Sequence, residues 1–114
     1  MKDSPYTIKE DATIADVLEV ITENHHGAVI VVDSDDQLVG VVSDGDLRRA
    51  LVKGATNLTP IFKILNPNVI SIREKNSQKE SARILKEHIE ITLVPVIDGN
   101  NRVRYVIPRT PETH

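Results

Sequence analysis

The feature that most constrains the fold is an internal repeat that runs through nearly all of the 114 residues. A shift of 64 residues places Thr7-Ile8 on Ser71-Ile72. After one inserted residue the shift becomes 65, and it places Val31-Val32-Asp33 on Val96-Ile97-Asp98. Self-similarity of this length predicts two copies of one supersecondary unit that share a core, because a single copy cannot bury its apolar face alone.

The first copy predicts a unit of strand, helix, strand and strand. Thr13 and Asp16 lie three residues apart and form a variant of the capping box that opens a helix. This helix is expected to end near Gly27, which can adopt a left-handed conformation. Ala28–Val32 is a continuous apolar run, typical of a strand buried on both faces, and Leu38–Val42 is its return strand.

The second copy repeats this order. Val69–Ile72 is expected to be its first strand, and Ser77 with Glu80 is expected to cap the helix that follows. Leu93–Ile97 and Val103–Ile107 predict the two remaining strands, separated by a turn that contains glycine.

The repeat also predicts the domain boundaries. We expect one module over residues 1–107, because the two copies share a core. Repeat one covers about residues 5–54, a connection covers 55–67, and repeat two covers about 68–107. Residues 108–114 contain two prolines and no apolar pattern, which is typical of a tail or a truncated linker.

One corner of the first copy can carry chemistry. The strand that ends at Ser43 is followed by a helix in which Leu47, Ala50 and Leu51 are apolar at helical spacing. Ser43 can cap this helix and Asp46 lies three residues on, so a hydroxyl, a carboxylate and free backbone N–H groups meet at one helix N-terminus. Such a corner can hold the hydroxyls and the phosphate of a nucleotide.

The second copy lacks this corner. The aligned positions are Gly40 with Tyr105, Ser43 with Pro108, and Asp46 with Pro111. A structural helix cap needs the same residue types at the same spacing, so capping and ligand binding both remain open for Ser43 and Asp46. The pairs Thr13/Asp16 and Ser77/Glu80 follow no glycine-containing strand of this kind, and we interpret them as caps alone.

Other polar residues have simpler interpretations. Arg48 and Arg49 are interpreted as a solvated helix face or a face toward a partner subunit, although one guanidinium could steer a phosphate. His25 and His26 are adjacent, so they do not face one way on a helix. No third ligand lies at metal spacing, and no metal site is expected.

Composition excludes several functions. Aromatic residues make up 3% and the net charge is −3, without a basic block, which argues against binding of nucleic acid. The chain has no cysteine, which fits a cytoplasmic protein. No apolar run approaches the roughly 20 residues that span a bilayer, so no membrane association is expected. No constellation of acid, base or nucleophile indicates an enzyme.

Two motifs in register across the repeat carry a family resemblance. Gly40–Asp46 matches the signature Gly-h-h-Thr/Ser-x-x-Asp, in which h is apolar, and Pro95–Asp98 matches Pro-Val-h-Asp. The chain therefore resembles a tandem pair of cystathionine-β-synthase (CBS) domains over about residues 5–107. The resemblance implies an α+β fold of two pseudo-symmetric β-α-β-β(-α) repeats packed sheet to sheet. In this sequence the second repeat is expected to lack the closing helix. It also implies adenosine-type ligands in clefts between the repeats.

The resemblance further implies a set of ligand-binding residues. Asp46 would accept hydrogen bonds from the ribose hydroxyls, while Ser43 and the N–H groups of Gly45 and Asp46 would face phosphate. The base would lie between Val41 and the second repeat. The implied residues are Val41, Ser43, Asp44, Gly45, Asp46 and His26 of the first repeat, and Ile70, Ser71, Ile91 and Thr92 of the second. AMP, ADP, ATP and S-adenosylmethionine all remain open, and no cofactor is required.

A narrower resemblance concerns the parent protein. The run Ser43–Leu51, followed by a glycine, is similar to the CBS pair at the N-terminus of bacterial sugar-phosphate nucleotidyltransferases. It implies a non-catalytic regulatory module that senses an adenine nucleotide and controls an attached catalytic domain. The alternative is a ligand-free structural dimerisation module. Either one is expected to form a homodimer or a larger assembly, because a second repeat without a closing helix leaves aliphatic surface exposed.

Overall fold

The computed structural model describes residues 4–111 and contains two units of the same order. The first unit comprises β1 (Thr7–Lys9), α1 (Ile14–Asn24), β2 (Ala28–Val32), β3 (Leu38–Ser43) and α2 (Asp44–Val52). A connection with the short 3-10 helix η1 (Ile61–Lys63) leads to the second unit. The second unit comprises β4 (Ile72–Arg73), the 3-10 helix η2 (Glu74–Asn76), α3 (Ser77–Glu87), β5 (Leu93–Ile97) and β6 (Val103–Pro108).

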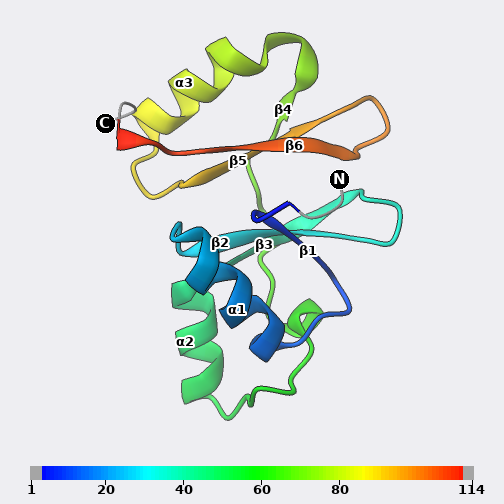
Figure 1. Cartoon of the computed structure of the whole chain (residues 1–114), viewed down its shortest axis with the longest axis vertical. Coiled ribbons are helices and arrows are strands. Elements are labelled where there is room, and N and C mark those ends of the chain that lie inside the picture. The colour runs from blue at the N-terminus through cyan, green and yellow to red at the C-terminus, as the bar shows by residue number, and fades with distance from the viewer. Residues whose placement is uncertain (1–3, 112–114) are drawn as a thin grey trace.

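Each unit builds a three-stranded sheet, in the orders β1-β2-β3 and β4-β5-β6. In both sheets the first pair of strands is parallel and the second is antiparallel. Figure 1 shows the sheets stacked on each other, with α1 and α2 outside the first sheet and α3 outside the second. The α+β fold with two pseudo-symmetric repeats packed sheet to sheet is therefore confirmed.

The central strands explain the continuous apolar runs of the sequence. All five residues of β2 and all five of β5 are buried. Alternate side chains of β2 point to opposite layers, since Val29 and Val31 pack under α1 and α2 while Ala28, Ile30 and Val32 pack against the second sheet. A strand between two apolar layers must be apolar at every position.

The two hairpins meet tip to tip and preserve the repeat. The Leu38 N–H donates to the carbonyl of Asn101 at 2.9 Å, and the Val103 N–H donates to the carbonyl of Asp36 at 2.8 Å. Asp36 and Asn101 both have φ of 63°. The contacts are reciprocal because Leu38 is equivalent to Val103 and Asp36 to Asn101, and the members of each pair are 65 residues apart, which is the spacing predicted from the sequence.

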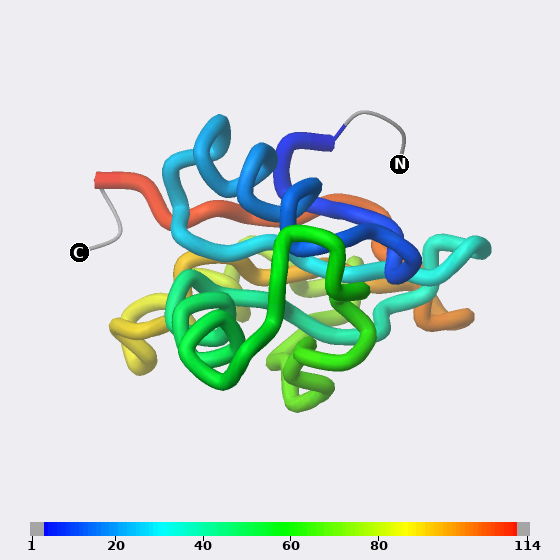
Figure 2. Tube along the Cα trace, turned by 90° about the horizontal axis from the view of Figure 1, so that it is seen from below, coloured from blue at the N-terminus to red at the C-terminus, as the bar shows by residue number. Residues whose placement is uncertain are grey.

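The connection returns along the helix side of the first sheet before it enters the second unit. The Ile14 N–H donates to the carbonyl of Thr59 at 3.0 Å, and the Ile61 N–H donates to that of Ala12 at 2.9 Å. Figure 2, seen from below, shows this segment in green beside the two helices of the first unit. The connection therefore packs against the module instead of linking two independent bodies.

Three predictions about local structure need correction. Of the strand expected over Val69–Ile72, only Ile72 lies in a strand, namely β4. Before it, Asn66 pairs with Val41 of the first sheet in an isolated bridge, and residues 67–71 then cross to the second sheet without belonging to a strand. Ser77 does not cap α3, since it is already helical with φ of −61° and ψ of −42°, and a cap needs extended backbone. Its hydroxyl instead lies 2.6 Å from that of Tyr105.

The third correction concerns the end of α1. The first left-handed residue is His25, with φ of 61°, whose N–H donates to the carbonyl of Ile21. Gly27 is also left-handed, with φ of 67°, but it lies beyond the cap and starts the turn into β2. Among residues 4–111, no helix has the length and apolar character needed to cross a membrane.

Candidate functional site

A cleft of about 370 Å³ opens at the junction of the two repeats. This volume lies at the lower end of the range for small-molecule sites, roughly 300–1,000 Å³. The first repeat, the connection and the loop before β5 all contribute to its walls. The lining residues are Ala28, Val41, Ser43, Asp46, Arg49, Asn66, Asn68, Val69, Ile70, Glu90, Ile91, Thr92 and Leu93.

Ser43 and Asp46 lie in this cleft as a complete capping box. The Asp46 Oδ2 atom accepts from the Ser43 N–H at 2.9 Å and from its hydroxyl at 3.0 Å. The Asp46 N–H donates to the Ser43 Oγ atom at 3.2 Å. The capping interpretation is therefore confirmed.

The Asp46 carboxylate has capacity for a ligand. Its side chain is 19% exposed, and its Oδ1 atom accepts from the Arg49 guanidinium at 2.8 Å. A carboxylate offers about four lone-pair directions, and three hydrogen bonds occupy it here. Two ribose hydroxyls could bind if the exposed Arg49 side chain shifts, because that ion pair lies at the surface and contributes little.

The connection forms one wall of the cleft by crossing β3 at close range. Val41 and Asn66 exchange two backbone hydrogen bonds, of 2.9 and 2.8 Å. A Cβ atom on Gly40 would lie 2.6 Å from the Asn66 carbonyl oxygen and 2.8 Å from the Leu65 Cδ1 atom. Only glycine fits at this position, and its presence in a strand is a sequence signal for such an approach.

The second repeat supplies the opposite wall. Ile70, Ile91 and Thr92 line the cleft, as the resemblance implies. The Thr92 hydroxyl donates to the carbonyl of His26 at 2.7 Å, so it joins the two repeats. The rim includes Glu90, whose carboxylate lies 3.4 Å from the His88 ring. The sequence carried no signal for Glu90 or for Asn68, because their position depends on how the repeats pack.

Four predicted ligand-binding residues do not line this cleft. Gly45 lies on the outer side of α2, and Ser71 lies just before β4. The Asp44 N–H donates to the carbonyl of Gly27 at 2.9 Å. His26 faces the other junction of the repeats, where its Nε2 atom lies 3.0 Å from the Arg109 carbonyl oxygen.

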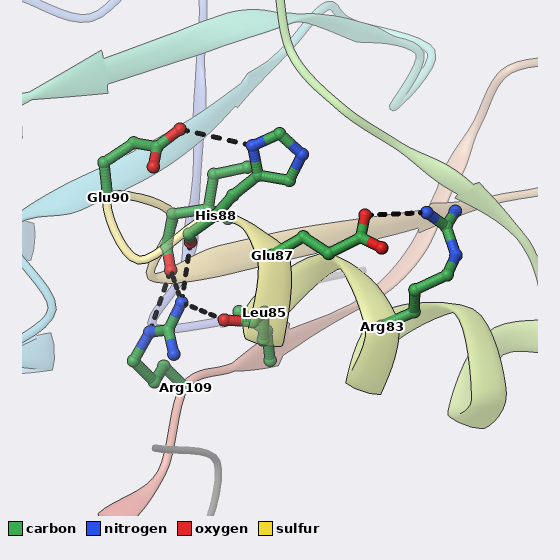
Figure 3. A network of polar contacts seen from close by, with 7 residues as sticks. Arg83, Leu85, Glu87, His88, Glu90 and Arg109 are labelled. Atoms are coloured by element: carbon green, nitrogen blue, oxygen red, sulfur yellow. Dashed lines mark hydrogen bonds and ion pairs between the residues drawn. The ribbon is translucent and has the colours of Figure 1, made fainter.

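Arg109 lies at that other junction, in a segment for which the sequence predicted a tail. Its Nη2 atom donates to the carbonyls of Leu85, His88 and Ile91 at 2.8, 2.8 and 2.7 Å (Figure 3). Its Nε atom also donates to Ile91, at 3.0 Å. Arginine near a helix C-terminus is a known capping residue, but partners 18 to 24 residues away leave no local sequence signal.

The sequence model of the CBS domain family matches residues 1–53 and 61–110. The chain therefore belongs to the CBS domain family, and the two matches correspond to its two repeats. Domains of this family are generally regulatory and non-catalytic.

Several known proteins are similar to this chain. Arabinose 5-phosphate isomerase GutQ from Salmonella typhi is 31% identical over 91 residues, which cover 80% of this chain and 28% of the relative. The chain spans between about a fifth and three tenths of the length of the curated relatives that it matches.

Two similar solved structures contain nucleotides. A CBS domain protein from Pyrobaculum aerophilum complexed with AMP is 25% identical, with a TM-score of 0.73 and coverage of 95% of this chain and 82% of that one. The cytosolic domain of the Mg²⁺ channel MgtE in complex with ATP is 28% identical, with a TM-score of 0.69 and coverage of 91% and 42%.

Proposed function

We propose that this chain is a cytoplasmic regulatory module that binds an adenine nucleotide in the cleft between its repeats. The observation that carries the proposal is the placement of the Ser43–Asp46 pair in a cleft that both repeats build. The Thr13–Asp16 pair has the same bonding pattern, but it does not line that cleft. The nucleotides in two similar CBS structures support the class of ligand.

The chemistry of the cleft suggests how a nucleotide would lie. Val41, Ile70 and Ile91 offer apolar surface from both repeats for the base. Asp46 would accept from the ribose hydroxyls, and the Arg49 guanidinium, which also lines the cleft, would pair with phosphate. Because the Asp46 carboxylate repels phosphate, the ribose must lie between Asp46 and the phosphate, which sets the direction of the ligand.

Regulation would follow from the shared walls. A ligand that contacts both repeats stabilises one relative arrangement of them, and it shifts the equilibrium only as far as its affinities for the two arrangements differ. We propose that the domain under control is an attached enzyme domain, because the curated relatives are three to five times longer than this chain. For its identity we propose a sugar-phosphate nucleotidyltransferase, on the Ser43–Leu51 run. The sequence encoded downstream of His114 tests this directly.

Calorimetric titration tests nucleotide binding. We expect the chain to bind one adenine nucleotide per protomer when it is titrated with AMP, ADP, ATP and S-adenosylmethionine in turn. Failure of all four to bind below millimolar concentration would favour the alternative, a ligand-free dimerisation module.

The same preparation should release no pyrophosphate from nucleoside triphosphate and sugar 1-phosphate, and activity that survives repurification would contradict a purely regulatory role.

We also propose a homodimer. The outer side of the second repeat carries a groove of about 430 Å³ between α3 and β6. Its apolar residues are Ala82, Leu85 and Ile107, and Tyr105 at its edge is 38% exposed. We propose that a second copy of the chain packs on this groove. Sedimentation at high micromolar concentration should show a dimer, and a species of 12.7 kDa would contradict it.

A further inference from the structure

Arg109 contacts three separate parts of the module. Its N–H donates to the carbonyl of Thr92 at 2.7 Å. Its guanidinium donates to carbonyls at the end of α3 and in the following loop, as Figure 3 shows. Its own carbonyl oxygen lies 3.0 Å from the His26 ring of the first repeat. One residue thus connects α3, the loop before β5 and the first repeat.

The end of α3 explains why an arginine is needed there. The last carbonyls of a helix have no partner within it, and the residue that follows α3, His88, has φ of −125° and forms no left-handed cap. The guanidinium has five donors in a rigid planar fork, so it can reach carbonyls of Leu85, His88 and Ile91 at once. Lysine has a single flexible ammonium and cannot reproduce this geometry.

The loop that Arg109 holds is also a wall of the cleft. Residues 88–92 connect α3 to β5 without regular structure. Glu90, Ile91 and Thr92 line the cleft, while the Ile91 and Thr92 carbonyls accept from Arg109. Residues 90–92 of this loop thus line the cleft, while the carbonyls of Ile91 and Thr92 accept hydrogen bonds from Arg109.

In the first repeat, other residues bind the corresponding turn between helix and strand. The residue equivalent to Arg109 is Asp44, whose N–H donates to the carbonyl of Gly27 just as that of Arg109 donates to Thr92. There α2 begins, and the turn before β2 is held by Asn24, whose side chain donates to the carbonyl of Ala28 at 3.0 Å. The second repeat has no counterpart of Asn24, since His88 stands there in the alignment.

We propose that Arg109 is a positioning residue that sets the second-repeat wall of the cleft and couples this wall to the segment that follows β6. The coupling to a ligand rests on the proposed function. A nucleotide that presses on Ile91 and Thr92 would change the contacts of Arg109, and by reciprocity a displacement of Arg109 would change nucleotide affinity. A change at the binding site would then alter the contacts at the start of the following segment, and the reverse, through one side chain.

The test compares Arg109→Lys with Arg83→Lys, a substitution on α3. Arg83 forms only exposed ion pairs with Glu80 and Glu87, so its replacement should be silent. In nucleotide-free protein we expect Arg109→Lys to raise amide hydrogen exchange in residues 88–93 at least 10-fold, because the loop loses its donors. Exchange in β2 should stay unchanged.

A second arm measures affinity. Arg109→Lys should weaken nucleotide binding roughly 5- to 50-fold, within the usual range of coupling between sites, and Arg83→Lys should bind as the wild type does. Unchanged exchange in residues 88–93 would overturn the positioning role, even if no nucleotide binds to the wild type. Raised exchange with wild-type affinity would overturn the coupling. If only the proposed function is wrong, the wild type will bind no nucleotide, but Arg109→Lys will still raise hydrogen exchange in residues 88–93.

Discussion

Replacing Asp46 with alanine is expected to weaken nucleotide binding roughly 10- to 150-fold. The carboxylate lies in the cleft at the end of β3, where it can accept hydrogen bonds from two ribose hydroxyls. Charge-assisted hydrogen bonds of this kind contribute about 1.5–3 kcal/mol, which corresponds to that change in affinity. Calorimetric titration of both proteins with the tightest-binding nucleotide measures the difference.

The substitution also removes a helix cap, so it needs a control that loses the same cap away from the cleft. Asp16 is that control, because its Oδ2 atom accepts from the Thr13 N–H at 2.9 Å and from its hydroxyl at 3.1 Å. Either substitution should lower the free energy of unfolding by about 0.5–2 kcal/mol, the usual loss for a capping side chain. Only Asp46→Ala should lower affinity, and equal affinities for the two variants would place the nucleotide elsewhere.

Replacing Gly40 with alanine is expected to destabilise the fold by about 1–3 kcal/mol, as overpacking of a tight site does. The added Cβ atom would meet the Asn66 carbonyl oxygen at 2.6 Å, and this backbone atom is itself held by the Val41 N–H. The clash can be relieved only if the connection lifts from β3. For a domain of this size the melting temperature should fall by roughly 5–15 °C.

Gly99→Ala is the matched control for this substitution. No heavy atom lies within 4 Å of its added Cβ atom, so its stability should stay within about 0.5 kcal/mol of the wild type. Thermal unfolding followed by circular dichroism compares the two variants. A melting temperature of Gly40→Ala equal to that of Gly99→Ala would show that the connection does not press on β3 in solution. Gly40→Ala should also weaken nucleotide binding, because Asn66 and Val69 form part of the cleft.

The carboxylate of Asp98 at the tip of the second hairpin makes the stability of the fold depend on pH in acid. The N–H groups of Arg102 and Asn100 donate to the Asp98 carboxylate and lower its pKa from 3.8. A folded-state pKa below the unfolded value means that the contribution to stability is present above pH 3.8 and is lost as the pH falls below it. The hairpin tips should therefore weaken only in strongly acidic solution.

The architecture could be predicted from the sequence because its signals are local. The apolar runs Ala28–Val32 and Leu93–Ile97 indicate strands buried on both faces wherever they lie in space. The capping boxes at Thr13 and Ser43 formed as predicted, since their residues are only three apart. The prediction for Ser77 was wrong because the preceding turn was already helical.

The cleft could be predicted only in part. Ser43, Asp46 and Val41 belong to one continuous strand-to-helix segment, and the structure places all three in the cleft. His26 and Ser71 do not line it, because their place depends on which junction of the two repeats each segment faces. Arg109 was assigned to a tail, although its guanidinium binds three carbonyls of residues 85–91.

The sequence by itself determined the repeat, its spacing, the two buried strands and the single Ser43–Asp46 corner. These follow from periodicity and from side chains that act on backbone a few residues away. Only the tertiary structure decided which surfaces face each other across the cleft, where the connection crosses Gly40, and which carbonyl groups Arg109 binds. The physical reason is that such contacts join residues far apart in the chain, and their partners are set by packing of the two sheets rather than by any local preference.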